Sequence, residues 1–163
     1  MTYSIIARDP ASGAFGVAAQ SHWFNVAQPV AWVRFGVGAV ATQASADPSY
    51  GWRGLALMAS GVDPATALRD LSATDEGREQ RQVAMMSTDG VVAARTGEQC
   101  IAHASHVTGD GWSVQGNLLA GPEVVDAMAA AFETTDGELA GRLVAALAAG
   151  QAAGGDARGR QSA

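Results

Sequence analysis

The order of strands and helices is the feature of this sequence that most constrains its fold. Strand-like segments come in neighbouring pairs joined by short turns, and pairs of helices interrupt and end the series. Asp89-Gly90 is the strongest turn signal, because an Asp-Gly pair readily adopts the positive φ values of a two-residue hairpin. Strand pairs joined this way form antiparallel sheets, with the intervening helices packed outside them. The order therefore predicts an α+β fold.

The individual elements follow from hydrophobic periodicity and from turn residues. The predicted strands cover residues 2–8, 14–21, 30–35, 37–43, 80–86, 91–96, 101–106 and 112–119. The predicted helices cover residues 50–60 and 64–71, a segment that begins at 122, and residues 138–149. No linker or internal repeat separates these elements, so we expect a single domain over residues 1–163.

Composition excludes several classes of function. Apolar residues make up 48% of the chain and charged residues 16%, which is typical of a folded domain. The net charge of −6 argues against nucleic acid or an anionic membrane surface as a partner. All 10 basic residues are Arg, so the chain has no Lys for a phosphate-binding P-loop or a Schiff base.

The compartment follows from weaker signals. The single Cys100 excludes an intramolecular disulfide and fits a reducing environment. The chain opens with strand-like sequence rather than a secretory signal, and its apolar stretches are shorter than the ~20 residues of a membrane span. We expect a cytoplasmic location.

Familiar catalytic and metal-binding motifs are missing. The segment Gly111–Gly116 has its second Gly one residue too late for a nucleophile elbow. His103 and His106 are three residues apart in a predicted strand, which directs them to opposite faces. We therefore expect neither a metal nor another cofactor.

Thr2 is the remaining candidate for chemistry. A residue this small permits removal of Met1, which leaves a hydroxyl nucleophile and an α-amine on one residue. The amine titrates near pH 8, so roughly a tenth to a fifth is neutral at pH 7 and able to accept the hydroxyl proton. An ordinary strand residue is the alternative interpretation.

Ordered blocks along nearly the whole chain are similar to one bacterial family. They cover residues 2–10, 20–24, 36–43, 47–51, 78–83, 114–117, 119–124 and 154–163. The sequence resembles a family of domains of unknown function whose fold is that of the N-terminal nucleophile (Ntn) hydrolases. The resemblance implies a four-layer αββα sandwich of two antiparallel sheets flanked by helices. It supplies no substrate.

The resemblance also implies catalytic residues. Thr2 begins the first strand, where Ntn enzymes hold their nucleophile. His22 stands where many relatives have Lys and would assist proton transfer, unless it only packs against Trp23. Asn117 would donate to an oxyanion, unless it only satisfies a local turn.

Five further polar residues are candidates for substrate binding. Arg81, with Gln82, would hold a substrate carboxylate, although a structural ion pair is an equal alternative. The other candidates stand at predicted strand ends, where plain turn residues are also common: Ser21, Gln43 and Ser45.

These residues lead to one principal hypothesis and two alternatives. The first is an Ntn-type hydrolase that cleaves an amide bond of a small molecule through Thr2. The second is a catalytically silent module of the same fold that binds a small ligand or assembles into oligomers. A metal-dependent hydrolase using the three His residues ranks last.

The C-terminal run of Gly and Arg is typical of a frayed tail, although it also matches the family. Relatives continue beyond it, so we expect this domain to lack one or more C-terminal strands found in them. A missing strand exposes a sheet edge, which favours a homo-oligomer.

Overall fold

The computed structural model describes residues 1–160 and contains two antiparallel four-stranded sheets. The first sheet has the order β2-β1-β8-β7, and the second has the order β3-β4-β5-β6. The strands of the first sheet are β1 (Thr2–Arg8), β2 (Phe15–Ser21), β7 (Ser105–Gly109) and β8 (Trp112–Asn117). Those of the second are β3 (Ala31–Arg34), β4 (Gly38–Ala44), β5 (Arg81–Ser87) and β6 (Val92–Thr96).

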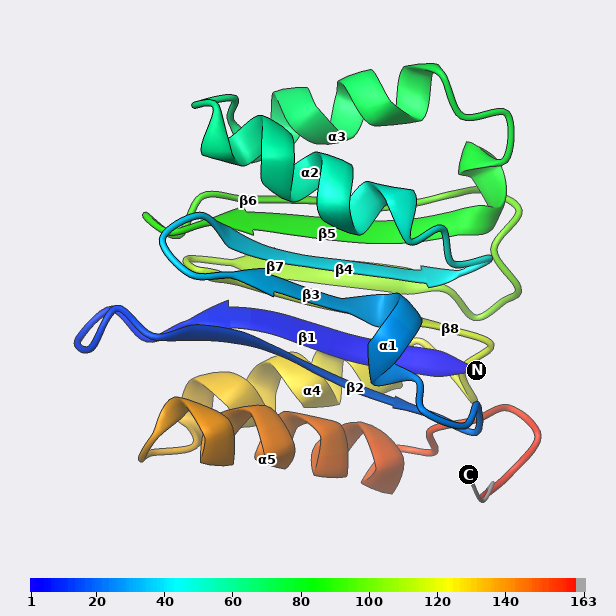
Figure 1. Cartoon of the computed structure of the whole chain (residues 1–163). Helices are drawn as coiled ribbons and strands as arrows, with labels where there is room; N and C mark the ends of the chain where they lie inside the picture. The colour runs from blue at the N-terminus through cyan, green and yellow to red at the C-terminus, as the bar shows by residue number, and fades with distance from the viewer. Residues whose placement is uncertain (161–163) are drawn as a thin grey trace.

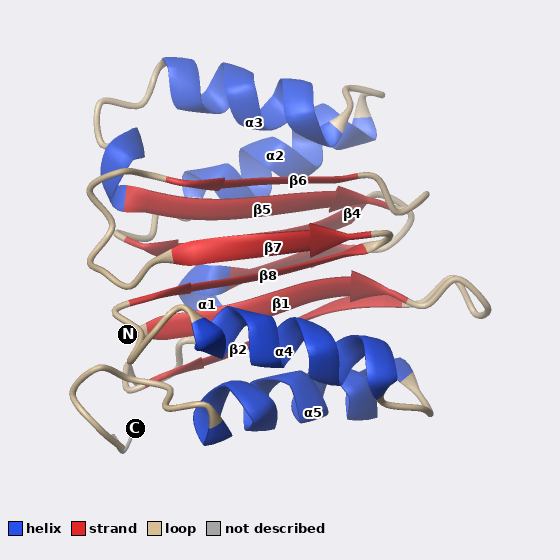
Figure 2. Ribbon diagram, turned by 180° about the vertical axis from the view of Figure 1, so that it is seen from behind, coloured by secondary structure: helices blue, strands red, loops and turns tan. Residues whose placement is uncertain are grey.

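Two pairs of helices cover the outer faces of the two sheets, and one short helix contacts a strand of each sheet (Figures 1 and 2). They are α1 (Ala27–Val30), α2 (Ser49–Ala59), α3 (Pro64–Ala73), α4 (Glu123–Thr134) and α5 (Leu139–Ala152), with a 3₁₀ turn at η1 (Arg78–Gln80). Helices α4 and α5 pack on the first sheet, whereas α2 and α3 pack on the second. The inner faces of the sheets contact each other, so the layers run helix, sheet, sheet, helix. The predicted α+β class and its two antiparallel sheets are confirmed.

Apolar side chains fill all three spaces between these layers. Phe132 and Met128 belong to the cluster between the first sheet and its helices, and Leu68 and Met85 to the cluster on the second sheet. The cluster between the sheets is built largely from small residues, namely Ala39, Ala41 and Ala84, together with Val30, Met86 and Ile6. Small side chains allow the two sheets to approach closely.

Local signals in the sequence explain several boundaries. Asp63 Oδ1 accepts a hydrogen bond from the Thr66 N–H at 3.0 Å, and Pro64 occupies the first turn, which together begin α3. Gly90 has a φ of 91° and donates its N–H to the Ser87 carbonyl at 3.0 Å, which closes the turn between β5 and β6. This hairpin was the strongest turn prediction, and it is confirmed.

Two predictions were wrong near the C-terminal half. The strand expected over 101–106 begins only at Ser105, because the Ile101 and His103 backbones bond to Leu118 and Leu119 beyond the end of β8. The expected frayed tail is also ordered in part, since Asp156 is 3% exposed and forms a bridge with Leu119. The last three residues of the matched C-terminal block lie outside the described residues, and further strands beyond the block remain a prediction.

Candidate functional site

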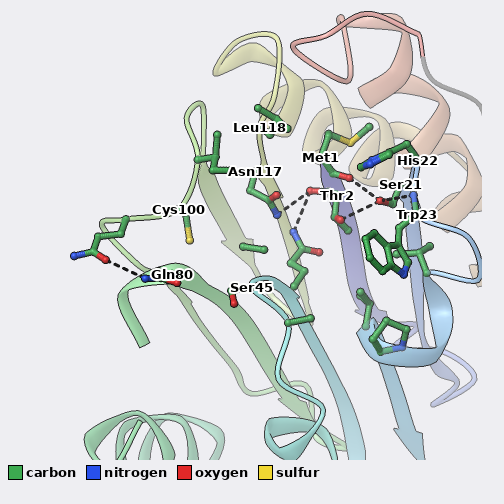
Figure 3. A pocket seen from close by; sticks show the side chains of 18 of the residues that line it. Met1, Thr2, Ser21, His22, Trp23, Ser45, Gln80, Cys100, Asn117 and Leu118 are labelled. Atoms are coloured by element: carbon green, nitrogen blue, oxygen red, sulfur yellow. Dashed lines mark hydrogen bonds between the residues drawn. The ribbon is translucent and has the colours of Figure 1, made fainter. Parts of the chain in front are cut away.

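A cavity of about 790 Å³ opens at one end of the sandwich (Figure 3). This volume is in the range of small-molecule sites in proteins. Thr2 begins β1 there, Ser21 ends β2, Ala44 ends β4 and Asn117 ends β8. The loop between β6 and β7 adds Gln99, Cys100 and Ile101 to the wall. Antiparallel pairing of β1 with β2 and with β8 sets Thr2 opposite both Ser21 and Asn117.

The Thr2 side chain lies on the cavity wall and is held by Ser21. Its hydroxyl donates to Ser21 Oγ at 3.2 Å, and Ser21 Oγ in turn donates to the Met1 carbonyl at 2.6 Å. Ser21 Oγ also accepts the Trp23 N–H at 3.1 Å. A single hydroxyl therefore orients Thr2 and the peptide bond that precedes it (Figure 3).

Three linked side-chain amides, which we call the amide clamp (Gln43, Gln82 and Asn117), lie beside the Thr2 backbone, and two of them hold it. Gln43 Nε2 and Asn117 Nδ2 donate to the Thr2 carbonyl at 3.3 and 3.2 Å. Gln82 Oε1 accepts from the same two amides, at 2.7 Å from Gln43 and 3.3 Å from Asn117. Gln43 and Gln82 are fully buried, so the bonds of the clamp are shielded from water.

The amide clamp continues into a polar network between the sheets. Ser4 Oγ donates to Gln43 Oε1 at 2.7 Å and accepts from Gln115 Nε2 at 2.6 Å. Gln82 Nε2 donates to the Gly116 carbonyl at 2.9 Å. Gln43, Gln82 and Gln115 are each bonded through both the oxygen and the nitrogen of the amide, as burial requires.

The chain terminus forms a charged corner beside the cavity. The Met1 ammonium lies 4.0 Å from Asp156 Oδ2, and burial lowers the pKa of this amino group. Arg158 Nε and Nη2 donate to the two Asp156 oxygens at 2.9 and 2.7 Å, and these bonds hold the Asp156 pKa below its ordinary value. Arg158 Nη2 also lies 3.0 Å from His22 Nδ1.

Arg81 lies outside the cavity lining, in an ion pair with Asp75. Its Nε is 2.5 Å from Asp75 Oδ2, and its Nη1 donates to the Ser45 carbonyl at 2.7 Å. The Tyr50 hydroxyl donates to the same Asp75 oxygen at 2.9 Å. The hydrogen bond from Arg81 lowers the Asp75 pKa. Arg81 thus fixes the loop that carries Ser45.

The cavity brings together most of the predicted site residues. Those on its wall are Thr2, Ser21, His22, Gln43, Ser45 and Asn117. Arg81 and Gln82 are not on the wall: Arg81 pairs with Asp75, and Gln82 bonds to the wall residues Gln43 and Asn117. Sequence reasoning did not single out Trp23, Ile101 or Arg158 as site residues, although Trp23 directly follows the candidate His22.

Two wall residues have unusual backbone geometry. Ala44 and Leu118 have φ values of 66° and 52°, in the left-handed region that favours glycine. Both lie where an inner strand ends at the cavity, one in each sheet. Strained residues of this kind cluster at functional sites, which strengthens the case for this cavity.

Comparison with families of known sequence gives a match over residues 2–163 to a family of unknown function, DUF1028. The chain belongs to the DUF1028 family. This match confirms one part of the resemblance, namely membership of a family of unknown function. No curated protein matches this DUF1028 chain.

A solved structure is similar to most of the DUF1028 chain. The crystal structure of protein SPO2555 from Silicibacter pomeroyi, also described as DUF1028, is 34% identical in sequence. The match has a TM-score of 0.90 and covers 94% of this chain and 71% of that chain. The arrangement of sheets and helices described above is therefore shared with another DUF1028 protein.

Clustered metal ligands and membrane-spanning helices are both missing from the described residues of this DUF1028 protein. Within residues 1–160, no three His, Cys, Asp or Glu side chains are grouped so that they could hold a metal ion. In the same part of the chain, every helix is too short or too polar to cross a membrane.

Proposed function

We propose that this protein is an Ntn-type hydrolase in which Thr2, freed by removal of Met1, cleaves an amide bond of a small molecule. The observation that carries the proposal is the position of the Thr2 hydroxyl, on the wall of the large cavity and hydrogen-bonded to Ser21. The two facing sheets with outer helices agree with the four-layer architecture of Ntn hydrolases.

The chemistry uses both functional groups of Thr2. The neutral α-amine accepts the hydroxyl proton while Oγ1 bonds to the substrate carbonyl carbon. The resulting tetrahedral oxyanion collapses, the C–N bond breaks, and the ammonium returns its proton to the leaving nitrogen. Water then attacks the acyl ester and gives one proton to the amine. The C–Oγ1 bond breaks and the ammonium returns that proton to Oγ1, which releases a carboxylic acid and regenerates Thr2.

The neighbouring residues position this nucleophile. Ser21 Oγ contacts the Thr2 hydroxyl, and His22 lies on the same wall. Asn117 Nδ2 already donates to the Thr2 carbonyl and to Gln82, so the proposal assigns it a positioning role rather than the oxyanion contact expected from the sequence. The other two amides of the clamp act in the same way.

The test combines intact mass with a covalent probe of the nucleophile. We expect the mature protein to lack Met1 and to form a single adduct with a β-lactone, which acylates an activated hydroxyl. The Thr2→Ala variant should form no adduct, Thr2→Ser should retain it, and the control Thr134→Ala, on the exposed end of α4, should react normally. Met1 retained quantitatively in reactive protein contradicts the mechanism.

A second candidate is a ligand-binding module without catalysis. The favouring observation is that Met1 fits the structure well, with 7% exposure, a bonded carbonyl and an ammonium near Asp156. This candidate predicts that Met1 is retained, that β-lactones do not react, and that ligand affinity is unchanged in Thr2→Ala.

A further inference from the structure

The mouth of the cavity carries large apolar side chains exposed to water. Trp23 is 65% exposed and Ile101 is 64% exposed, and both line the cavity. They come from different parts of the chain, since Trp23 follows β2 and Ile101 lies in the loop between β6 and β7. Apolar surface gathered at a cavity is typical of a ligand-binding site. An apolar group of the ligand would cover this surface.

The charge of the wall differs from that of the whole chain. The chain has 16 acidic and 10 basic residues, yet the described residues lining the cavity include no Asp or Glu. They include Arg158 and His22. Behind the wall, Arg158 pairs with the buried carboxylate of Asp156, which is not itself part of the lining. This end of the cavity therefore favours a ligand anion, because the described part of its lining offers the Arg158 guanidinium and no carboxylate that an ammonium ligand could contact.

We infer that the ligand of this cavity is an N-acylated amino acid with an apolar side chain and a free carboxylate. Its apolar group contacts Trp23 and Ile101, and its carboxylate lies toward Arg158 and His22. The inference rests on the proposed function in taking the cavity as the substrate site. Hydrolysis of the ligand's amide bond then yields a carboxylic acid and a free amino acid.

Three probes with one apolar group and different charges test the inference. They are N-acetyl-L-phenylalanine, an anion; N-acetyl-L-phenylalaninamide, which is neutral; and L-phenylalaninamide, a cation. Binding is measured by titration calorimetry with Thr2→Ala protein, so that no probe is hydrolysed. We expect the anion to bind about fivefold more tightly than the neutral amide, as for a solvent-accessible ion pair, and the cation to bind most weakly. Equal affinities, or tightest binding of the cation, would overturn the inference.

Substitutions at the cavity test the apolar contact and the carboxylate contact separately. Trp23→Ala should weaken binding of the anion about tenfold or more through lost apolar contact, whereas the control Trp52→Ala should not change it. Trp52 is 58% exposed on α2 and does not line the cavity. Equal effects of the two substitutions would contradict the apolar contact.

The role of the Arg158 charge is tested by variants that remove or keep it. Arg158→Gln should abolish the preference for the anion over the neutral amide, and Arg158→Lys should keep part of it. Arg34→Gln, on the exposed β3 edge, is the control and should preserve the preference. If Arg158→Gln fails to fold, the anion preference of Arg158→Lys and the affinities of the three probes for protein with an unchanged Arg158 still decide the outcome. A β-lactone adduct at Thr2 without this ligand preference would leave the proposed hydrolase intact and refute only the ligand class.

Discussion

The space between the two sheets differs from the two spaces between sheet and helices. The outer clusters consist of apolar residues such as Phe132, Met128 and Leu68, whose packing is non-directional. The inner space is apolar around Ile6 and Met86 but contains the buried amides of Gln43, Gln82 and Gln115 elsewhere. The hydrogen bonds of side-chain amides are directional, so each amide fixes the orientation of the next one. The outer spaces therefore stabilise the fold, whereas the polar inner region positions Thr2.

The largest expected effect on stability comes from the outer cluster. Phe132 is 2% exposed, packs with its ring centroid 6.1 Å from that of Trp112, and lies 4.2 Å below the Arg142 guanidinium. Phe132→Ala should lower the free energy of unfolding by about 3–5 kcal/mol because it leaves a cavity. Urea denaturation measures this loss.

The control for this variant is Phe24→Ala, because Phe24 is 84% exposed. It should change the stability by at most about 0.5 kcal/mol. Folded Phe132→Ala protein should still form the β-lactone adduct at Thr2. Loss of that reaction in fully folded protein would show that the outer cluster also positions the nucleophile, and the division of roles would fail.

A smaller loss of stability, with a larger loss of reactivity, is expected from Gln43→Leu. The change leaves the buried partners of Gln43 unsatisfied, which costs about 1–3 kcal/mol. It also removes one of the two amides that hold the Thr2 carbonyl, so the β-lactone reaction should slow. Denaturation and adduct formation are measured on the same protein.

The matched control is Gln28→Leu, which alters an exposed Gln bonded only locally to Asn25. The double variant Gln43→Leu/Gln82→Leu should lose less stability than the sum of the two single changes, because the residues share a hydrogen bond. Additive losses, with unchanged reactivity, would mean that the amides act independently and do not position Thr2.

The smallest loss of stability is expected from a change at Arg81, which bonds to Asp75 after α3 and to the cavity loop that carries Ser45. Arg81→Lys keeps the charge beside Asp75 but loses the second donor, so it should cost about 1 kcal/mol at pH 7. Arg81 lowers the Asp75 pKa, and this contribution to stability is present above the ordinary carboxyl pKa and is lost as pH falls through the folded value. The difference between wild type and variant should therefore shrink at acid pH.

Denaturation curves at pH 7 and at pH values below about 4 measure this dependence. Arg69→Lys is the control, since Arg69 and Asp70 form an exposed pair that should contribute little. A wild-type advantage that grows as pH falls would contradict the role assigned to the Asp75 carboxylate.

Most of the fold could be predicted because its signals are local. The cap at Asp63 and the Asp89-Gly90 turn each act through neighbours in the sequence. The segment from Ile101 to Ala104 was predicted wrongly, since its backbone partners lie beyond β8 and no local pattern specifies them. The turn residues Gly109-Asp110-Gly111 indicated a strand before them but did not fix where that strand begins.

The site was predictable only in part. Strand ends and the family resemblance pointed to Thr2, Ser21 and Asn117, which the structure brings together. Gln82 was expected to face a ligand, but its burial depends on how the two sheets face each other, which the sequence does not encode locally. Arg158 was missed because its contact with His22 spans most of the chain.

The amino terminus has one further consequence for experiments. A sequence without Lys leaves the α-amine as the one primary amine, which belongs to Met1 in this structure and to Thr2 once Met1 is removed. The Met1 side chain is 3% exposed beside Asp156. An amine-directed reagent would consequently label one position, and it would react only when the structure around that amine opens locally. Its labelling rate in native buffer would report the local opening of the site's edge, without interference from the rest of the surface.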